Sequence, residues 1–331
     1  MILTRTPLRI SFLGGGTDYP GFFRSNGGCV LGTTVNLHVY TTIVQHSELA
    51  DAKFKISYRL NESVNSISEI DHPLVRATLQ ELNWGNQPLH ISTLADVPAM
   101  TGLGSSSSFA VGLIQALSSL QGQVLSAREL AKTAIKIERD LLREHGGWQD
   151  QILAAYGGLN LIQFAQNDFD VTPIRNAQSI QKELSSRLVL VAAGEPRRST
   201  HVAELTNSRS KQSDFVKLFG RMSELTSDIS KAIESAQNSK SAIDILAQGV
   251  LEAWNLKKQI SVDVDPNVEK TILAGMRSGA VAAKLCGAGG TGFVAFILGD
   301  VESEEFISKF SSNRIQRVSC FPSGSEIAYQ K

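Results

Sequence analysis

The segment Pro98–Ser108 combines glycines with four consecutive serines, a composition that favours phosphate binding. Gly102 and Gly104 allow the backbone to approach an anion closely, and Ser105–Ser108 add hydroxyl donors. An apolar helical pattern follows directly, so a helix N-terminus would direct free N–H groups and partial positive charge at the anion. The lysine of a Walker A loop is absent, which excludes that P-loop. The alternative is a plain loop with an ordinary serine N-cap.

Two further glycine-rich segments stand next to expected strands. Gly14–Tyr19 follows the first strand, and Gly287–Gly292 lies between two apolar runs. The second matches the G-x-G-x-x-G of dinucleotide-binding proteins, but that fingerprint requires a helix after the glycines. Phe293–Leu298 instead has the composition of a buried strand. A hairpin turn that brings backbone close to a ligand is therefore favoured over the Rossmann interpretation, with a purely structural turn as the alternative.

Glu138 falls on the apolar stripe of a predicted helix, with the apolar residues of that stripe at Ala131, Ala134, Ile135 and Leu142. A carboxylate there must be paired, protonated or bound to a cation, because an uncompensated buried charge is costly. Mg²⁺ takes one or two carboxylates and leaves its other positions to phosphate and water. Glu138 with a serine hydroxyl therefore suits a nucleotide-bound Mg²⁺, and a structural hydrogen bond or ion pair is the alternative.

Three more charged residues, Asp150, Asp18 and Arg9, are candidates for a functional role. Asp150 follows a Gly-Gly pair before an apolar stretch, which is also typical of a helix N-cap. Asp18 follows three glycines and is equally typical of a turn. Arg9 is in phase with Ser11 on the first strand, which predicts a solvated face of a sheet. Six scattered histidines show no metal-ligand spacing.

A basic pair, Arg197 and Arg198, follows the apolar run Leu188–Ala193 and precedes Ser199 and Thr200. Two guanidinium groups with two hydroxyls suit a phosphate group. The alternative is a solvated basic loop.

The elements that must position these residues follow from hydrophobic periodicity and β-branched content. Strands are expected over Leu8–Phe12, Val30–Val44, Ile91–Leu94, Leu159–Phe164, Leu188–Ala193 and the two arms of Val281–Leu298. Helices are expected over Phe109–Leu120, after the capping box Ser126–Glu129, and over Ser213–Ala236 and Ala242–Gln259. The polar segment Gln166–Ser186 is expected to join two domains. The elements do not repeat as strict βαβ units, so the predicted class is α+β.

The composition is that of an ordinary globular protein of about two domains: 331 residues, of which 42% are hydrophobic. Thirty-two basic residues balance 32 acidic ones, so the charge points neither to nucleic acid nor to an anionic membrane. Three widely spaced cysteines give neither a disulfide framework nor a zinc site. No signal peptide or membrane span is read from the sequence, and a cytoplasmic location is expected.

Taken together, the three glycine-rich segments resemble the motifs of the GHMP kinases, the superfamily named for galactokinase, homoserine kinase, mevalonate kinase and phosphomevalonate kinase. Thr6–Tyr19, Met100–Ser108 and Lys284–Gly292 match those motifs in order and spacing. The resemblance implies an ATP-binding domain over residues 1–182 with the ribosomal-S5-like fold. It implies a second, ferredoxin-like α+β domain over residues 183–331, with ATP and substrate between the two.

Within the superfamily, the Gly-Gly-Gly-Thr-Asp form of Gly14–Asp18 is most similar to the heptose 7-phosphate kinases. Those enzymes phosphorylate the anomeric hydroxyl of a phosphorylated heptose on the way to nucleotide-activated heptose for surface glycans. Galactokinases carry Glu-His in place of Gly15 and Gly16, which argues against galactose. Fucokinase-like and other sugar 1-kinases remain open.

The resemblance also implies roles for individual residues. Asp150 would be the catalytic aspartate, with Arg9 near the reacting phosphate, and Ser106 and Glu138 would hold Mg²⁺. The ATP phosphates would be bound by Gly102, Leu103, Gly104, Ser105, Ser106 and Ser107. The sugar phosphate would be bound by Gly15, Gly16, Thr17, Asp18, Arg197, Arg198, Gly289 and Gly290.

The implied partners are therefore ATP and a small sugar phosphate, with no nucleic acid and no membrane, and a homodimer is left open. Two rival functions stay in view. One is a non-catalytic member of the superfamily that binds sugar and ATP, against which the intact Asp150, Glu138 and Arg9 argue. The other is a dinucleotide-dependent oxidoreductase that uses Gly287–Gly292.

Overall fold

The computed structural model describes residues 1–47, 50–98, 101–193, 212–260, 265–287, 292–310 and 314–331. Within these residues the strands form two sheets, and the larger sheet has the order β13-β1-β2-β5-β3-β4. β6 and β12 also pair with β2, and β7 pairs with β6. Its strands are β1 (Ile2–Leu13), β2 (Gly28–Gln45), β3 (Phe54–Ser57), β4 (Asn61–Val64), β5 (Leu89–Ala95), β6 (Leu159–Ala165), β7 (Asp168–Pro173), β12 (Cys320–Phe321) and β13 (Glu326–Gln330).

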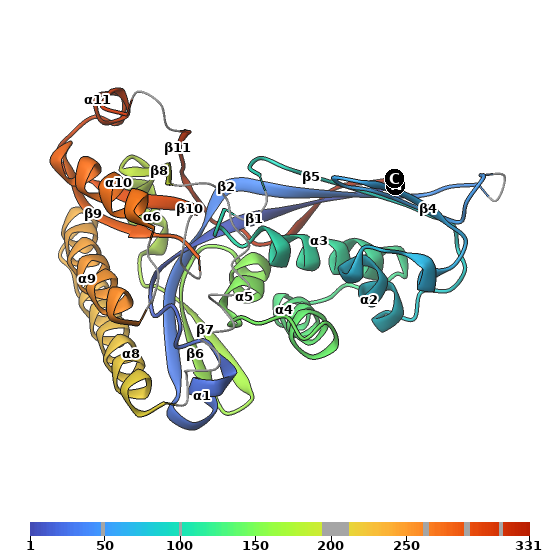
Figure 1. Cartoon of the computed structure of the whole chain (residues 1–331), viewed down its shortest axis with the longest axis horizontal. Coiled ribbons are helices and arrows are strands. Elements are labelled where there is room, and N and C mark those ends of the chain that lie inside the picture. The colour runs from blue at the N-terminus through green and yellow to red at the C-terminus, as the bar shows by residue number, and fades with distance from the viewer. Residues whose placement is uncertain (48–49, 99–100, 194–211, 261–264, 288–291, 311–313) are drawn as a thin grey trace.

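One side of this sheet is covered by helices that carry the candidate residues Ser105–Ser107, Glu138 and Asp150 (Figure 1). They are α2 (Pro73–Glu81), α3 (Ser105–Leu120), α4 (Ala127–Ile135), its π-helical continuation η2 (Lys136–Leu141) and α5 (Gln149–Tyr156). α3 packs on β1 and β2, the two longest strands. The alternation of Leu8, Ile10 and Phe12 places all three side chains in the core. The short elements α1 (Pro20–Asn26) and η1 (Ile67–Glu69) complete this part.

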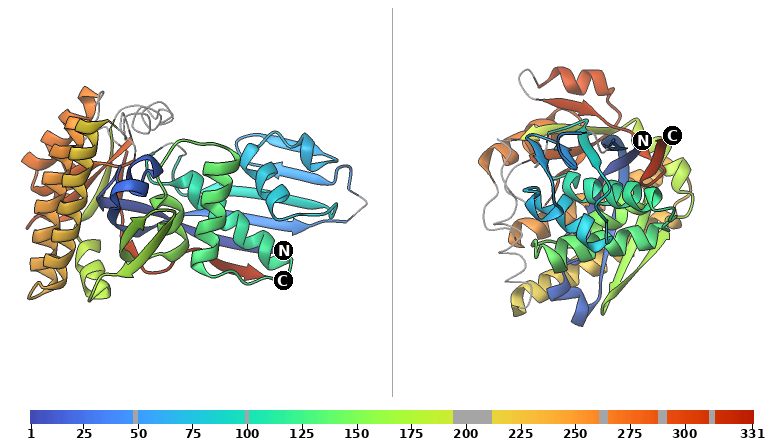
Figure 2. Two further views of the ribbon diagram at one scale, coloured as in Figure 1. Left: turned by 90° about the horizontal axis from the view of Figure 1, so that it is seen from below. Right: turned by 90° about the vertical axis from the view of Figure 1, so that its right-hand side faces the viewer.

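The second sheet has the order β11-β8-β10-β9, all antiparallel. Its strands are β8 (Leu188–Ala193), β9 (Ala280–Leu285), β10 (Gly292–Leu298) and β11 (Ile315–Arg317). The helices that accompany it are α6 (Ala177–Ser185), α8 (Ser213–Glu234), α9 (Ser239–Ile260), α10 (Pro266–Arg277) and α11 (Ser303–Ser308). α8 and α9 lie side by side, and both also contact the long strands of the first sheet (Figures 1 and 2).

The chain therefore has the predicted α+β class, with each expected strand and helix present within a few residues. The C-terminal strands β12 and β13 return to the first sheet, where β13 pairs with β1 beside the N-terminus (Figure 2). The division into residues 1–182 and 183–331 stays a prediction, and these last strands pair with the sheet of the first part. In the part of the chain that the structure describes, no helix is long and apolar enough to cross a membrane.

The place of the polar segment Gln166–Ser186 between two domains stays a prediction, but the segment has regular structure of its own. It forms β7 and α6, and its buried apolar side chains are those of Phe169, Ile174, Ile180 and Leu184. The low apolar content hid these elements in the sequence, because four well-spaced anchors are enough to fix a short strand and a short helix on a larger core.

Candidate active site

The centre of the site is a buried ion pair between Arg9 on β1 and Asp150 in the first turn of α5. Arg9 Nε donates to Asp150 Oδ1 at 2.8 Å, and Nη2 donates to Oδ2 at 2.7 Å. The guanidinium is only 5% exposed, whereas the carboxylate is 23% exposed. Such a two-point contact fixes the orientation of the carboxylate and leaves its remaining lone pairs accessible to a hydroxyl.

Neither sequence alternative for these two residues holds. The N-cap of α5 is Trp148, so Asp150 is not the cap. Arg9 is buried rather than solvated, because its face of β1 is covered by the Gly102–Gly104 loop. Arg9 Nη1 donates to Gly102 O at 2.6 Å, and the Arg9 backbone N–H donates to Leu103 O at 3.1 Å. The segment that covers Arg9 is almost a hundred residues away in sequence, so strand periodicity could not have revealed it.

The Gly102–Gly104 loop leads directly into α3, which begins at Ser105, four residues before the predicted start, so the four serines form its first turn. Gly104 is the N-cap in the left-handed region with φ 81°, so the alternative of a serine N-cap is wrong. Ser105 is half-buried and Ser106 is exposed, and no acidic residue lies in this first turn. Within the described residues, the first N–H groups of α3 have no backbone partner, and they stand at an accessible position close to Arg9, an arrangement that can accept phosphate groups.

The third glycine-rich segment packs directly on this loop. Gly102 and Gly287 both have positive φ, and a Cβ on Gly287 would lie 2.7 Å from Gly102 Cα. β9 and β10 pair antiparallel on either side of the segment, so the predicted hairpin is confirmed. The oxidoreductase alternative is wrong, since a strand and not a helix follows the glycines. Gly289 and Gly290 lie outside the described residues.

Glu138 is 1% exposed, which confirms the burial that the apolar stripe predicts. Its Oε2 accepts from Ser107 Oγ at 2.8 Å and from Gln151 Nε2 at 2.5 Å. Both donors are neutral, and within the described residues no lysine or arginine forms an ion pair with Glu138. A buried carboxylate held only by neutral donors fits a site for a cation.

Two neighbouring serines, Ser106 and Ser107, are candidates to share a metal ion with Glu138. The predicted ligand Ser106 is exposed, while Ser107 directs its hydroxyl at Glu138. The pair Ser106–Glu138 stays a prediction, and Ser107 joins it as a candidate. A run of four serines at a helix start gives no sequence signal for the one that faces a distant carboxylate.

Asp18 is fully buried next to the ion pair. Its oxygens accept from the backbone N–H groups of Gly16 at 3.1 Å and Gln149 at 3.2 Å. Gly147 allows this close approach, because a Cβ there would lie 1.8 Å from Asp18 Oδ2. Burial, and secondly the negative charge of Asp150, raise the pKa of Asp18 to about 6.

The rest of the segment Gly14–Tyr19, called the first glycine loop below, is held by hydrogen bonds and packing. Thr17 Oγ1 lies 2.8 Å from the carbonyl oxygens of both Gly14 and Cys29, so this buried hydroxyl fixes the loop. Gly16, with φ 104°, approaches the ring of Phe219 on α8. The contacts with the sugar that were predicted for Gly15, Gly16, Thr17 and Asp18 stay predictions. Arg197 and Arg198 lie outside the described residues.

Asp18 gives the first test of the site, through the pH dependence of stability. Between pH 4 and pH 6 the folded protein holds a proton on Asp18 that the unfolded chain, with a pKa of about 3.9, releases. Raising the pH through this window therefore lowers the free energy of unfolding, by about 2–3 kcal/mol for a shift of this size. Asp18→Asn does not titrate, so wild type should lose stability relative to this variant as pH rises from 4 to 7.

The measurement is urea unfolding of both proteins at several pH values, with Asp51→Asn as an exposed control that should show no such relative change. A wild-type stability that rises relative to Asp18→Asn would contradict the prediction, since it requires a lowered pKa.

Several buried polar atoms around the ion pair have no hydrogen-bond partner within the described residues. They include Ser11 Oγ, Thr101 Oγ1, Trp148 Nε1, Gln149 Oε1 and Gln151 Oε1. Buried polar groups are normally satisfied, so a cluster of this kind indicates groups that a ligand or water completes. All five come from segments that also carry the candidate residues, namely β1, the loop before α3 and the start of α5.

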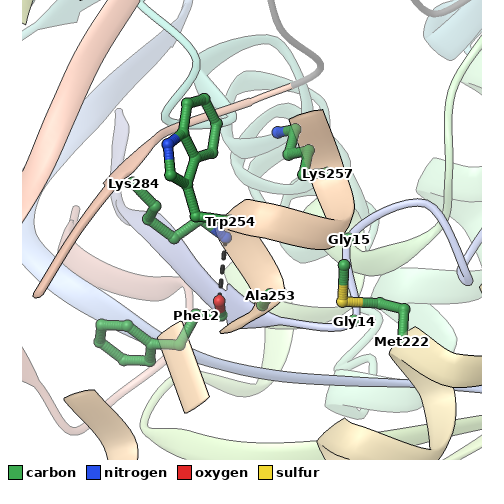
Figure 3. A pocket seen from close by; sticks show the side chains of 8 residues that line it. All are labelled: Phe12, Gly14, Gly15, Met222, Ala253, Trp254, Lys257 and Lys284. Carbon is green, nitrogen blue, oxygen red and sulfur yellow. Dashed lines mark hydrogen bonds between the residues drawn. The ribbon is translucent and has the colours of Figure 1, made fainter. Parts of the chain in front are cut away.

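Sequence reasoning missed two lysines that line a pocket beside the first glycine loop (Figure 3). Lys257, near the end of α9, donates to Gly287 O at 2.6 Å. Lys284, on β9, donates to Phe12 O at 3.0 Å and also to Ser11 O. Lys284 could have been found as a lysine within an apolar strand, whereas Lys257 stands beside Lys258 and carries no distinguishing signal.

The chain is similar in sequence and in fold to known proteins. The family described as "GHMP kinases N terminal domain" matches residues 72–158. The chain is 30% identical over 309 residues to the D-glycero-alpha-D-manno-heptose 7-phosphate kinase of Campylobacter jejuni, covering 90% of this chain and 89% of that one. It is 25% identical over 318 residues to the bifunctional fucokinase/GDP-fucose pyrophosphorylase of Arabidopsis thaliana, covering 89% of this chain but 30% of that longer protein.

Among solved structures, a D-glycero-D-manno-heptose 1-phosphate kinase from Bacteroides thetaiotaomicron superposes with a TM-score of 0.77. It is 24% identical, and the match covers 98% of each chain. The mevalonate kinase of Methanococcus jannaschii gives a TM-score of 0.74 at 20% identity over 96% of this chain and 98% of that one. These likenesses show the fold.

Proposed function

This chain belongs to the GHMP kinases, and from that premise we propose that it transfers the γ-phosphoryl group of ATP to the anomeric hydroxyl of D-glycero-D-manno-heptose 7-phosphate. The product would be the 1,7-bisphosphate, an intermediate on the way to nucleotide-activated heptose for surface glycans. The observation that carries the kinase assignment is the Arg9–Asp150 ion pair beside the start of α3. The relative from Campylobacter jejuni supports the choice of a phosphorylated heptose.

In this proposal Asp150 receives the acceptor hydroxyl. Arg9 holds both carboxylate oxygens in place, so the carboxylate cannot rotate away from the hydroxyl. Asp150 then orients that hydroxyl and takes its proton as the bond to phosphorus forms, which is the role of a general base. Arg9 also contacts Gly102 O, and this links the acceptor side of the site to the loop that binds the donor phosphates.

The donor phosphates would lie at the start of α3. Backbone N–H groups of Gly102–Ser107 and the helix N-terminus offer hydrogen bonds and positive potential where negative charge accumulates. Glu138, with Ser106 or Ser107, would hold Mg²⁺, which neutralises charge on the ATP phosphates when bound. The neutral hydrogen-bond donors around Glu138 and its lack of a described cationic partner support this assignment.

ATP turnover against a panel of hexoses, heptoses and their terminal phosphates tests the proposal. Heptose 7-phosphate should give the highest kcat/KM, with the new phosphate on the anomeric carbon in the phosphorus NMR spectrum of the product. A higher kcat/KM for unphosphorylated fucose would favour the fucokinase-like alternative, which the Arabidopsis relative keeps in view. ATP binding without turnover of any sugar would favour a non-catalytic family member.

Arg197 and Arg198 are proposed to contact the phosphate that the acceptor already carries. Replacing both with Ala should raise KM for heptose 7-phosphate about 10- to 100-fold, the value of a hydrogen-bonded charge contact. KM for ATP should stay nearly unchanged, since its phosphates are held at the start of α3. Equal use of phosphorylated and unphosphorylated heptose by the native enzyme would contradict this prediction.

A further inference from the structure

The pocket beside the first glycine loop has apolar walls and a cationic lining. Phe12, Met222 and Trp254 form apolar walls, and Lys257 and Lys284 reach it from α9 and β9 (Figure 3). Gly15, which belongs to the first glycine loop, also lines the pocket. Among the described residues that line the pocket, none is acidic. The cavity is small and mostly apolar, and it brings the side chains of two lysines from different elements close together beside the glycines.

The two lysines have only neutral partners. Lys257 donates to one backbone carbonyl and Lys284 donates to two. Within the described residues neither forms an ion pair with a carboxylate. Burial lowers the pKa of Lys257 to about 8, and burial together with the charge of Lys257 lowers the pKa of Lys284 to about 7. An incoming anion would stabilise the protonated form of the half-buried Lys257 and of the buried Lys284, since neither has a carboxylate partner among the described residues.

The charged groups near the two lysines are compatible with a bound anion. Arg9 adds positive charge but is neutralised by Asp150, and Asp18 is the remaining carboxylate that acts on Lys257. Burial raises the pKa of the Cys286 thiol, which therefore carries no negative charge at neutral pH. When both lysines are protonated, the cationic side chains of Arg9, Lys257 and Lys284 outnumber the two aspartates, and a bound anion favours that protonated state.

The pocket lies at a fixed separation from the reacting centre. Lys284 bonds to the carbonyls of Ser11 and Phe12, which follow Arg9 by two and three residues on β1. A strand advances about 3.3 Å per residue, so this contact lies roughly 7–10 Å along β1 from Arg9. A sugar bound at Asp150 would have to bridge this separation for its far end to reach these lysines.

Next to the pocket, Gly15 leaves space for a ligand and Ser11 has a hydroxyl group that could bind one. The φ of Gly15 is not in the left-handed region, and a Cβ there would have only Ser11 Oγ within 4 Å, at 3.8 Å. Ser11 Oγ is itself a buried hydroxyl without a partner among the described residues. The loop therefore leaves space and one unused hydroxyl next to the two lysines.

We propose that Lys257 and Lys284 form a subsite for the phosphomonoester that the acceptor sugar carries at the end remote from its reacting hydroxyl. This inference rests on the proposed function, because it assumes an acceptor that is already phosphorylated. It assigns a role to Lys257, which lies outside the sequence motifs, and to Lys284, the first residue of the third motif. The pair would bind the same phosphate in addition to the proposed contacts of Arg197 and Arg198.

Lys257→Met tests the subsite, since this lysine is only half-buried and has one carbonyl partner. Its loss should raise KM for heptose 7-phosphate about 10- to 100-fold, as expected for a charge-assisted contact. KM for ATP, and kcat/KM for the same heptose without its phosphate, should change less than about twofold. Lys258→Met, which removes the exposed neighbouring lysine, is the matched control and should leave all these values unchanged.

A loss of kcat for both acceptors alike would overturn the inference, because it would place Lys257 at the transferred phosphoryl group. An unchanged KM for heptose 7-phosphate would overturn it as well. Gly15→Ala, which adds one methyl group at the pocket without backbone strain, should raise KM for the phosphorylated sugar in the same selective way.

A binding measurement separates this inference from the proposed function. Inorganic phosphate, added to enzyme saturated with MgADP, should raise Tm of wild type and of Lys258→Met but not of Lys257→Met. If wild type turns over no heptose 7-phosphate yet shows this pattern, the proposed acceptor is wrong and the anion subsite stands. If heptose 7-phosphate is the best acceptor and Lys257→Met responds to phosphate like wild type, the subsite is wrong and the proposed function stands.

Discussion

Asp150→Asn is expected to lower kcat by about 10²–10⁴, the usual contribution of a general base. Asn keeps the size of the side chain but loses basicity, and its amide group cannot accept the second hydrogen bond from Arg9. Affinity for ATP should change little, since the donor phosphates lie at the start of α3, and it could tighten slightly when a negative charge is removed. Steady-state kinetics paired with calorimetric titration of ATP at fixed Mg²⁺ provide the measurement.

Asp140→Asn is the matched control, because Asp140 is an exposed aspartate on the neighbouring η2 segment and should retain full activity. The thermal midpoint of both variants separates a catalytic loss from unfolding. If Asp150→Asn keeps more than about a third of kcat, proton abstraction is unimportant and Asp150 acts only as the structural partner of Arg9.

Substitution of Glu138 gives the second large effect, and here two variants must be compared. Glu138→Ala removes the acceptor for Ser107 and Gln151, which leaves two buried donors unpaired and destabilises the fold by about 1–3 kcal/mol for each. Glu138→Gln retains one carbonyl acceptor but removes the negative charge, so it should remain folded and bind Mg²⁺ weakly. We expect both variants to raise the Mg²⁺ concentration for half-maximal rate by 10-fold or more.

The assay titrates Mg²⁺ at saturating ATP and sugar, beside Glu252→Gln as an exposed control on α9. If Glu138→Gln melts earlier than wild type but keeps the wild-type Mg²⁺ dependence, Glu138 is a structural acid within a hydrogen-bonded network. The metal assignment would then pass to other residues.

Much of the fold was predictable because it depends on short-range patterns. The capping box at Ser126 and Glu129 forms as predicted, with the Ser126 side chain accepting from Glu129 N and the Glu129 side chain accepting from Ser126 N. The hairpin that follows Leu285 and the helix that begins at Ser105 are equally local. Each rests on hydrogen bonds or periodicity within a few residues, which a single sequence contains.

The environments of the charged residues were not predictable in the same way. Strand phase placed Arg9 on a solvated face, yet a loop that begins almost a hundred residues later buries it. The stripe pattern showed that Glu138 must be buried, but it did not show that Ser107 and Gln151 would be its partners. Long-range contacts of this kind depend on how sheets and helices pack, and hydrophobic periodicity records only which side of an element faces inward.

The sequence by itself determined the α+β class, the three glycine-rich segments and the resemblance to GHMP kinases, because glycine placement and periodicity are local properties of the chain. Only the tertiary structure decided that Arg9 holds Asp150 and contacts Gly102, and that Lys257 and Lys284 share one pocket. These residues come from β1, α5, the loop before α3, α9 and β9. Packing brings these distant segments within a few ångströms of one another, and burial lowers the local dielectric, so their charges interact. Neither effect can be read from spacing along the chain.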